Sequence, residues 1–182
     1  MGTIEDEKYG KIIAPGVIRF RRLLPGPIEK VWSYLTESEK RAKWLASGHT
    51  ELKVGGRVDF HFKHSDLSER DIPIPDKYKD MENGHSFFGK VREVNPPYLL
   101  SYTWGEDVEG VSEVTFELSP KGDQVELILT HRKLTEAMKV SVAGGWHTHL
   151  GILEDVLANR SPRGFWEVST EVEKVYRERM NI

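Results

Sequence analysis

The residue best suited to proton chemistry is His131, at the end of a segment in which apolar and polar residues alternate. Apolar residues occupy every second position from Val125 to Leu129, so alternation places His131 on the same apolar face. A buried imidazole needs hydrogen bonds. His131 could therefore be a core histidine satisfied by neighbouring backbone, or a group that orients a ligand or acts as a general acid or base. Tyr102 is the second candidate for such a catalytic role.

Large aromatic residues recur on the same apolar faces. They could simply form a core, but apolar pockets with few polar groups are also the usual sites of small molecules. We expect a void between Trp104, Phe116 and Trp146, and His149 could reach its edge, one residue from Leu150. The residues predicted to line this cavity are Trp44, Phe60, Phe62, Phe87, Tyr102, Trp104, Phe116, His131, Trp146 and Leu150.

Metal binding and nucleophilic hydrolysis are not favoured. His147 and His149 lie two residues apart on a predicted helix, about 200° around its axis, so they cannot share an ion. His61 and His64 would lie on opposite faces of a strand. The chain has no cysteine and no Gly-x-Ser-x-Gly motif. We therefore expect no metal and no cofactor.

The charge balance argues against a nucleic-acid or membrane partner. The 182 residues include 26 basic and 29 acidic side chains, for a net charge of −3. No apolar run approaches the ~18 residues of a membrane span. The first 16 residues are polar and unlike a signal peptide. We expect a cytoplasmic protein that inserts into no membrane.

Two short helices should follow the first strand. Residues 17–24 read as a strand, with a short partner near residues 9–13. Pro27 suits a first helical turn, because its missing N–H would have no partner there. Apolar residues continue at helical spacing to Leu35. Thr36 and Glu39 then make a capping-box pattern, which predicts a second short helix ending near residue 45.

Residues 51–134 alternate with a period of two and predict about six strands. One face is apolar and the other charged, which is typical of an antiparallel sheet that is covered on one side. Residues 64–84 form a long polar insertion between two of these strands. Such an insertion is either a lid over a cavity mouth or a connector.

A long helix, residues 135–160, should cover the apolar face. Thr135 can cap it, and Gly144-Gly145 interrupts it at about 1 kcal/mol per glycine, unless backbone must approach something bulky there. One more amphipathic helix follows from Phe165 to Met180. We expect it to pack on the two short helices; a contact in a homodimer is the alternative.

The order of elements predicts an α+β fold: a curved antiparallel sheet of six or seven strands around a long C-terminal helix. With four local signatures, this order resembles the START-related (SRPBCC) superfamily with the helix-grip, birch-pollen-allergen-like fold. Within it, the chain is similar to the branch named for the C-terminal domain of the heat-shock-protein-90 ATPase activator. The signatures are residues 24–32, 54–57, 94–104, and 129–131 with 144–153.

The resemblance covers roughly residues 17–158. We expect a helix-grip domain over residues 1–160, with residues 161–182 as an appended amphipathic helix of the same domain. The resemblance also implies a hydrophobic cavity between sheet and helix, but not one function. The first hypothesis is binding of an apolar small molecule: a lipid, a polyketide or an aromatic metabolite. The second is a cyclase or other enzyme acting in the cavity. The third is a co-chaperone-like activator of a heat-shock ATPase.

Overall fold

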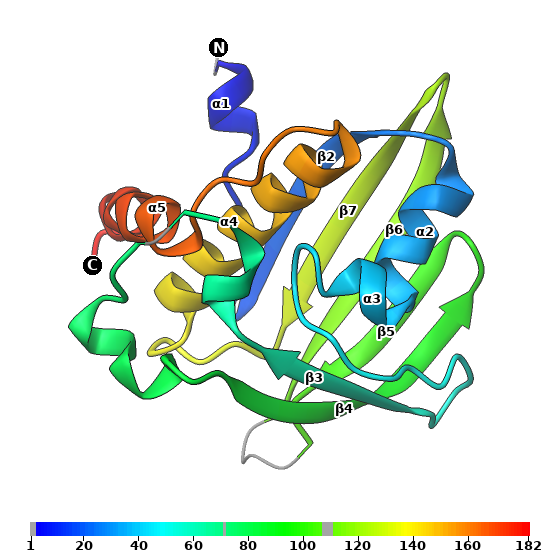
Figure 1. Ribbon diagram of the computed structural model, residues 1–182, viewed down its shortest axis with the longest axis horizontal. Helices are drawn as coiled ribbons and strands as arrows, with labels where there is room; N and C mark the ends of the chain where they lie inside the picture. Colours follow the sequence, from blue (N-terminus) through cyan, green and yellow to red (C-terminus); the bar gives the residue numbers. More distant parts are fainter. Residues whose placement is uncertain (1–2, 71, 107–110) are drawn as a thin grey trace.

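The computed structural model describes residues 3–70, 72–106 and 111–182, and these form a strongly curved antiparallel sheet that holds a long helix against its concave face (Figure 1). The sheet has seven strands in the order β1-β2-β7-β6-β5-β4-β3. The predicted α+β helix-grip fold is therefore confirmed. The strands are β1 (Lys11–Ala14), β2 (Val17–Pro25), β3 (Arg57–Phe62), β4 (His85–Asn95), β5 (Leu99–Trp104), β6 (Ser112–Lys121) and β7 (Gln124–Arg132).

Alternation along the strands makes the sheet one-sided. In β6, Val114 and Phe116 are buried, while the intervening Thr115 faces away from the core and its hydroxyl lies 3.2 Å from that of Ser101. Phe116 is directly opposite Leu100 on β5 and Leu129 on β7. Side chains at opposed positions on one face pack against each other. The concave face is thus a continuous apolar surface that a helix must cover.

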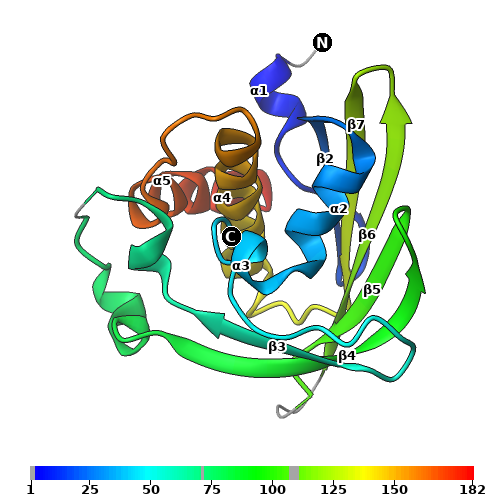
Figure 2. The same cartoon turned by 45° about the vertical axis from the view of Figure 1, so that its right-hand side comes forward.

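The helices lie at the open side of this sheet (Figure 2). They are α1 (Ile4–Glu7), α2 (Ile28–Thr36), α3 (Ser38–Arg41), the 3-10 helices η1 (His64–Leu67) and η2 (Asp76–Met81), α4 (Lys139–Leu157) and α5 (Phe165–Arg179). The insertion at residues 64–84 thus contains two short helices; its residue 71 lies outside the described part of the chain. No described helix is both long and apolar enough to cross a membrane.

The predicted capping box at Thr36 is wrong. Thr36 is the last residue of α2, and its hydroxyl donates to the Trp32 carbonyl at 3.0 Å. α3 instead begins after Glu37, which makes no side-chain cap, and it ends at Arg41. The buried Arg41 side chain turns inward there and donates to three backbone carbonyls, Ala46, Gly48 and Asp59, at 2.7–2.9 Å.

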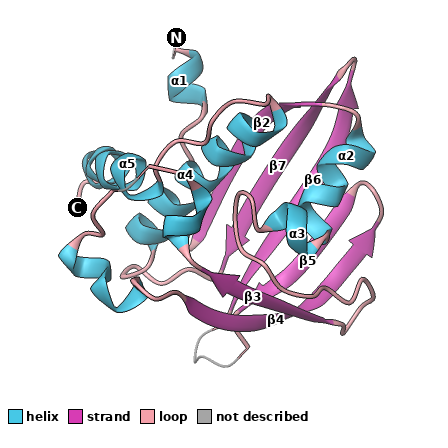
Figure 3. Ribbon diagram, in the orientation of Figure 1, coloured by secondary structure: helices cyan, strands magenta, loops and turns pink. Residues whose placement is uncertain are grey.

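The long helix begins four residues later than predicted. Lys139 is the first residue of α4, and the Thr135 carbonyl instead accepts from the Met138 N–H in a turn at 3.1 Å. Trp146 and Leu150 face the sheet, as the apolar spacing predicted. Yet α4 also buries residues on its opposite side, because α5 covers it there (Figure 3).

The C-terminal helix packs on α4 and not on the two short helices, which corrects the prediction. The contact is close: a Cβ added to Gly144 would lie 2.7 Å from Cγ of Glu173 on α5. Further along α5, the buried Tyr176 hydroxyl accepts from the Gly10 N–H at 2.7 Å. The amphipathic pattern identified the apolar face of α5 but not its partner, since helix and sheet surfaces are equally apolar.

Candidate functional site

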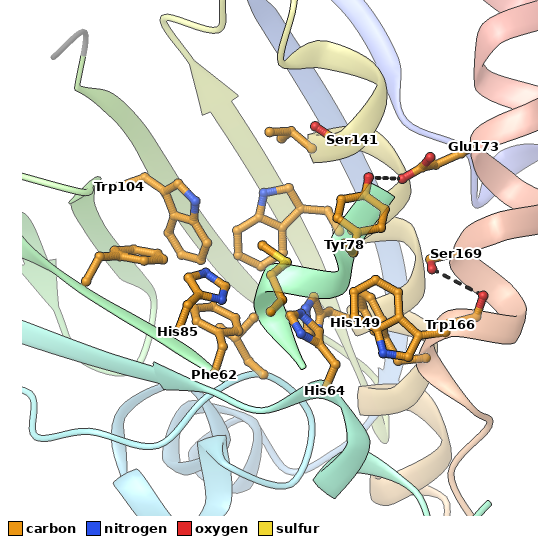
Figure 4. Close-up of a pocket in the computed structure, with 17 residues that line it drawn as sticks. Phe62, His64, Tyr78, His85, Trp104, Ser141, His149, Trp166, Ser169 and Glu173 are labelled. Carbon is orange, nitrogen blue, oxygen red and sulfur yellow. Dashed lines mark hydrogen bonds between the residues drawn. The ribbon is translucent and has the colours of Figure 1, made fainter. Parts of the chain in front are cut away.

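A cavity of about 180 Å³ lies between α4, α5, η1, η2 and the ends of β3 and β4 (Figure 4). It is bounded by elements far apart in the sequence. The described residues that line it are Leu45, Phe62, His64, Tyr78, Met81, His85, Phe87, Trp104, Ser141, Val142, Gly145, Trp146, His149, Phe165, Trp166, Ser169 and Glu173.

Aromatic rings in mutual contact form most of the cavity wall. Phe87 lies 4.9 Å from Trp104, ring centre to ring centre, and Trp104 lies 4.9 Å from Trp146. On the opposite side Phe165 and Trp166 meet edge to face at 4.9 Å. Such edge-to-face and tilted pairs are favourable beyond the area they bury, so these contacts stabilise the wall.

Only part of the predicted lining set borders the cavity. Phe62, Phe87, Trp104 and Trp146 line it. The space expected between Trp104, Phe116 and Trp146 is filled, since Phe116 and Trp146 meet at 5.9 Å. The void lies beyond these rings, toward α5. The remaining predicted residues pack as a layer behind the wall: Trp44, Phe60, Tyr102, Phe116, His131 and Leu150.

His131 lies in this rear layer with both ring nitrogens bonded. The Trp146 indole N–H donates to Nδ1 at 2.9 Å, so Nδ1 is an acceptor and Nε2 carries the proton that it donates to Ser112 at 2.7 Å. Burial lowers the pKa of His131 to about 3. The ring is therefore neutral, and its evident role is to orient the Trp146 indole that faces the cavity.

Tyr102 and Trp44 are likewise held behind the wall. The Tyr102 ring contacts Phe60 at 5.3 Å and Phe116 at 6.0 Å, and burial raises the pKa of its hydroxyl well above the ordinary value. Trp44 donates its indole N–H to the Tyr34 carbonyl at 2.7 Å. These side chains support the wall and do not reach the cavity.

Three imidazoles, those of His64, His85 and His149, border the cavity; we call them the imidazole cluster. The His64 ring lies 5.5 Å from that of His149 and 6.1 Å from that of His85, and Phe62 stacks on both His64 and His85. Burial, followed by the like charge of its neighbours, lowers the pKa of His64 to about 2. Burial also lowers the pKa of His149 to about 4 and that of His85. All three rings are neutral near pH 7.

The proton of His149 can be placed. Its Nδ1 lies 2.7 Å from the Trp44 carbonyl, which only accepts, so Nδ1 carries the hydrogen. A neutral ring has one hydrogen, hence Nε2 offers a lone pair. The buried Nδ1 atoms of His64 and His85 have no hydrogen-bond partner among the described residues.

Sequence reasoning missed His64 because it considered this residue only together with His61, as a metal pair, although alternation from Phe60 and Phe62 places His64 on the apolar face. In the structure β3 ends at Phe62, and His64 begins η1 with its ring against Phe165 at 4.3 Å. His149 was expected to reach the cavity edge, and it does border the cavity. The imidazole cluster as a whole carries no signal in the sequence, since its members come from three distant elements.

Tyr78 and Glu173 close the rim between η2 and α5 (Figure 4). The Tyr78 hydroxyl donates to Glu173 at 2.5 Å, and its ring stacks on Trp166 at 5.1 Å. Lys77 also reaches Glu173 at 3.5 Å. We call the Tyr78–Glu173 contact the rim latch. Burial, followed by the hydrogen bond to Glu173, raises the pKa of Tyr78.

The arrangement does not favour a metal. In the described ranges, no group of three or more His, Cys, Asp or Glu side chains is placed to hold an ion. The imidazole cluster borders one space without converging on a single point. What it can do chemically is exchange hydrogen bonds with a bound molecule.

Residues 25–158 match the family described as Activator of Hsp90 ATPase homolog 1-like protein, and the chain belongs to this family. It is thereby a member of the START-related SRPBCC superfamily, in the branch that the resemblance indicated. No protein of curated function matches the chain.

Solved structures show the same fold. A Bordetella parapertussis protein determined by solution NMR is 40% identical, with a TM-score of 0.79, over 94% of this chain and 90% of that one. The crystal structure of CalU16 from Micromonospora echinospora is 22% identical, with a TM-score of 0.65, over 89% and 86%. DynU16, from the dynemicin biosynthetic locus, is 17% identical, with a TM-score of 0.63, over 81% of this chain and 49% of that one. The family match and these likenesses support, in general terms, a ligand-binding fold.

Proposed function

We propose that this protein binds an apolar small molecule in the cavity between α4, α5 and η2. The observation that supports it best is an aromatic-lined void that the long helix leaves open. At Gly145 a Cβ would meet no atom within 4 Å, whereas the neighbouring Gly144 is in close contact with α5. A helix glycine without a packing reason costs about 1 kcal/mol relative to alanine. Keeping the cavity free is a reason for a glycine at position 145.

The size of the cavity restricts which class of ligand can bind. An engineered cavity of about 150 Å³ in another protein binds benzene. At about 180 Å³, this cavity suits one substituted ring better than a lipid or a large polyketide. Of the ligand classes considered, an aromatic metabolite therefore fits best.

The positions of His131 and Tyr102 favour a binding protein over an enzyme that uses these two residues. Both are packed behind the wall, and His131 has both nitrogens engaged. A general acid or base must come within hydrogen-bond reach of its substrate. A cyclase acting through these two residues would need them to cross the aromatic wall.

Filling the cavity tests the proposal. In Gly145→Leu the new side chain should enter the cavity, and binding of propylbenzene, measured by NMR shifts of the lining residues, should weaken at least tenfold. Gly55→Leu is not a suitable control, because Gly55 has a positive φ. Leu52→Met, at an exposed position, should leave binding unchanged. Wild-type protein that binds no such probe would contradict the proposal.

The same variant distinguishes ligand binding in the cavity from the co-chaperone hypothesis. An activator would act on its ATPase through a surface, so a filled cavity should not alter that stimulation. If the protein stimulates a heat-shock ATPase equally with and without Gly145→Leu, the surface function stands and the cavity is not required for it.

A further inference from the structure

The polar groups of the cavity define what kind of ligand it can accept. The imidazole cluster supplies three of them at one end, and Tyr78, Ser141, Ser169 and Glu173 supply the others, while aromatic and aliphatic side chains form the rest of the wall. His64 is 8% exposed, and its Nδ1 is buried without a partner among the described residues. A buried polar atom without a hydrogen bond is costly, at about 1–3 kcal/mol. Nδ1 itself has almost no accessible surface, so the imidazole must turn about its Cβ–Cγ bond before a ligand in the cavity can supply the missing bond and recover that energy.

The hydrogen-bonding pattern of the cluster matches a hydroxyl group. His149 offers a lone pair at Nε2, because its hydrogen is committed to the Trp44 carbonyl. Its neighbour His64, with rings 5.5 Å apart, is a neutral imidazole with one donor and one acceptor. A hydroxyl both donates and accepts, so it can give its hydrogen to one ring and receive one from the other.

The charges around the cavity disfavour an anion. No Lys or Arg is among the described residues that line it, and Glu173 contributes a carboxylate. Lys77 and Arg177 lie close by, but both already face Glu173, at 3.5 and 3.9 Å. A ligand carboxylate would therefore need a protonated imidazole, and burial opposes that protonation.

We propose that the ligand is a compact, uncharged aromatic molecule with a hydroxyl group, whose hydroxyl bonds to His64 and His149 while its ring lies against Trp104 and Trp146. This rests on the proposed function and names its ligand class. Most of the apolar surface comes from six rings, those of Phe62, Phe87, Trp104, Trp146, Phe165 and Trp166.

Three matched probes test the ligand class on the intact wild-type protein. We would titrate 4-propylphenol, propylbenzene and 4-propylbenzoate and measure dissociation constants by calorimetry and NMR shifts. Hydrophobic transfer alone favours propylbenzene, because a hydroxyl must be desolvated. We expect the phenol to bind about tenfold tighter than propylbenzene, since its hydroxyl is paired on entry, and the benzoate to bind weakest.

Variants of His64 test where the hydroxyl binds. His64→Phe should keep propylbenzene binding but abolish the preference for the phenol, as its ring can occupy the same place against Phe165 and Trp166. His64→Asn puts an amide near the position of Nδ1 and should restore most of the preference. His61→Phe makes the same change on an exposed side chain, hydrogen-bonded to Ser86, and should alter nothing.

The outcomes distinguish the two proposals. If none of the probes binds, the proposed function fails together with this inference. If propylbenzene binds as tightly as the phenol, or the benzoate binds tightest, the cavity is a binding site but the ligand class is wrong. If His64→Phe keeps the phenol preference, the assignment of the hydroxyl to His64 is wrong. His64→Phe must show wild-type backbone NMR shifts away from the cavity. If it does not, His64→Leu, which also lacks a hydrogen-bonding group, provides the same test.

Discussion

At the scale of single residues, this protein uses buried histidines as neutral hydrogen-bonding groups. His131 accepts from Trp146 and donates to Ser112, so one ring connects α4 to β6. Each net hydrogen bond contributes about 1 kcal/mol, and a buried group that loses its partner costs more. A ring that sequence alternation made a candidate acid or base thus has a clear structural role.

His131→Asn should lower the free energy of unfolding by about 2–4 kcal/mol at pH 7, because Ser112 or Trp146 loses its partner and a cavity remains. Urea unfolding followed by circular dichroism measures it. His61→Asn, at an exposed position, should change stability by less than about 0.5 kcal/mol. A His131→Asn protein as stable as wild type would refute the structural role.

At the scale of elements, the insertion at residues 64–84 covers the cavity from the side of α5. Both η2 residues that border the cavity, Tyr78 and Met81, come from it. The rim latch joins it to Glu173, and the stack of Tyr78 on Trp166 adds a second contact. We therefore propose that this insertion, whose sequence allowed a lid or a connector, is a lid.

Tyr78→Phe should keep the stack and remove the rim latch. Loss of about 1 kcal/mol at this contact predicts about fivefold faster opening of η2. Amide hydrogen exchange of residues 76–84, compared with that of β6, measures it. Tyr98→Phe, at a side chain that is 50% exposed, is the matched control. Equal exchange in both variants would mean that the latch does not hold the insertion closed.

At the scale of the whole molecule, stability should depend on keeping several imidazoles uncharged. Burial lowers the pKa of His64 to about 2, that of His131 to about 3 and that of His149 to about 4, against an ordinary 6.5. Below pH 6.5 the unfolded chain takes up protons that the folded protein refuses. The three neutral rings therefore contribute their full stability above pH 6.5. This contribution is lost as the pH falls toward their pKa values in the folded protein.

At pH 5 each of these three rings should cost about 2 kcal/mol relative to pH 7, so the free energy of unfolding should fall by several kcal/mol. Urea unfolding at pH 7, 6 and 5 tests this. Because burial is the main cause, 1 M salt should change the loss little, whereas it would screen surface ion pairs. A stability that stays flat down to pH 4 would show that these rings are solvated.

Local pattern was enough to predict the sheet, because alternation states which face of a strand is apolar. Phe60, Phe62, Phe116 and His131 all lie inside as predicted. Alternation cannot state whether an inward residue meets another side chain or an empty space. The void was therefore expected beside Phe116, where the rings in fact pack.

The sequence by itself determined an antiparallel sheet around a long helix and the apolar faces that build its core, since both follow from spacing along the chain. Tertiary structure alone decided the position of the cavity and its chemistry. His64 meets Phe165 and Trp166 only because α5 packs beside η1, and Glu173 reaches the rim only because α5 packs on Gly144. A site assembled from η1, β4, α4 and α5 depends on how distant surfaces meet, which no local period encodes.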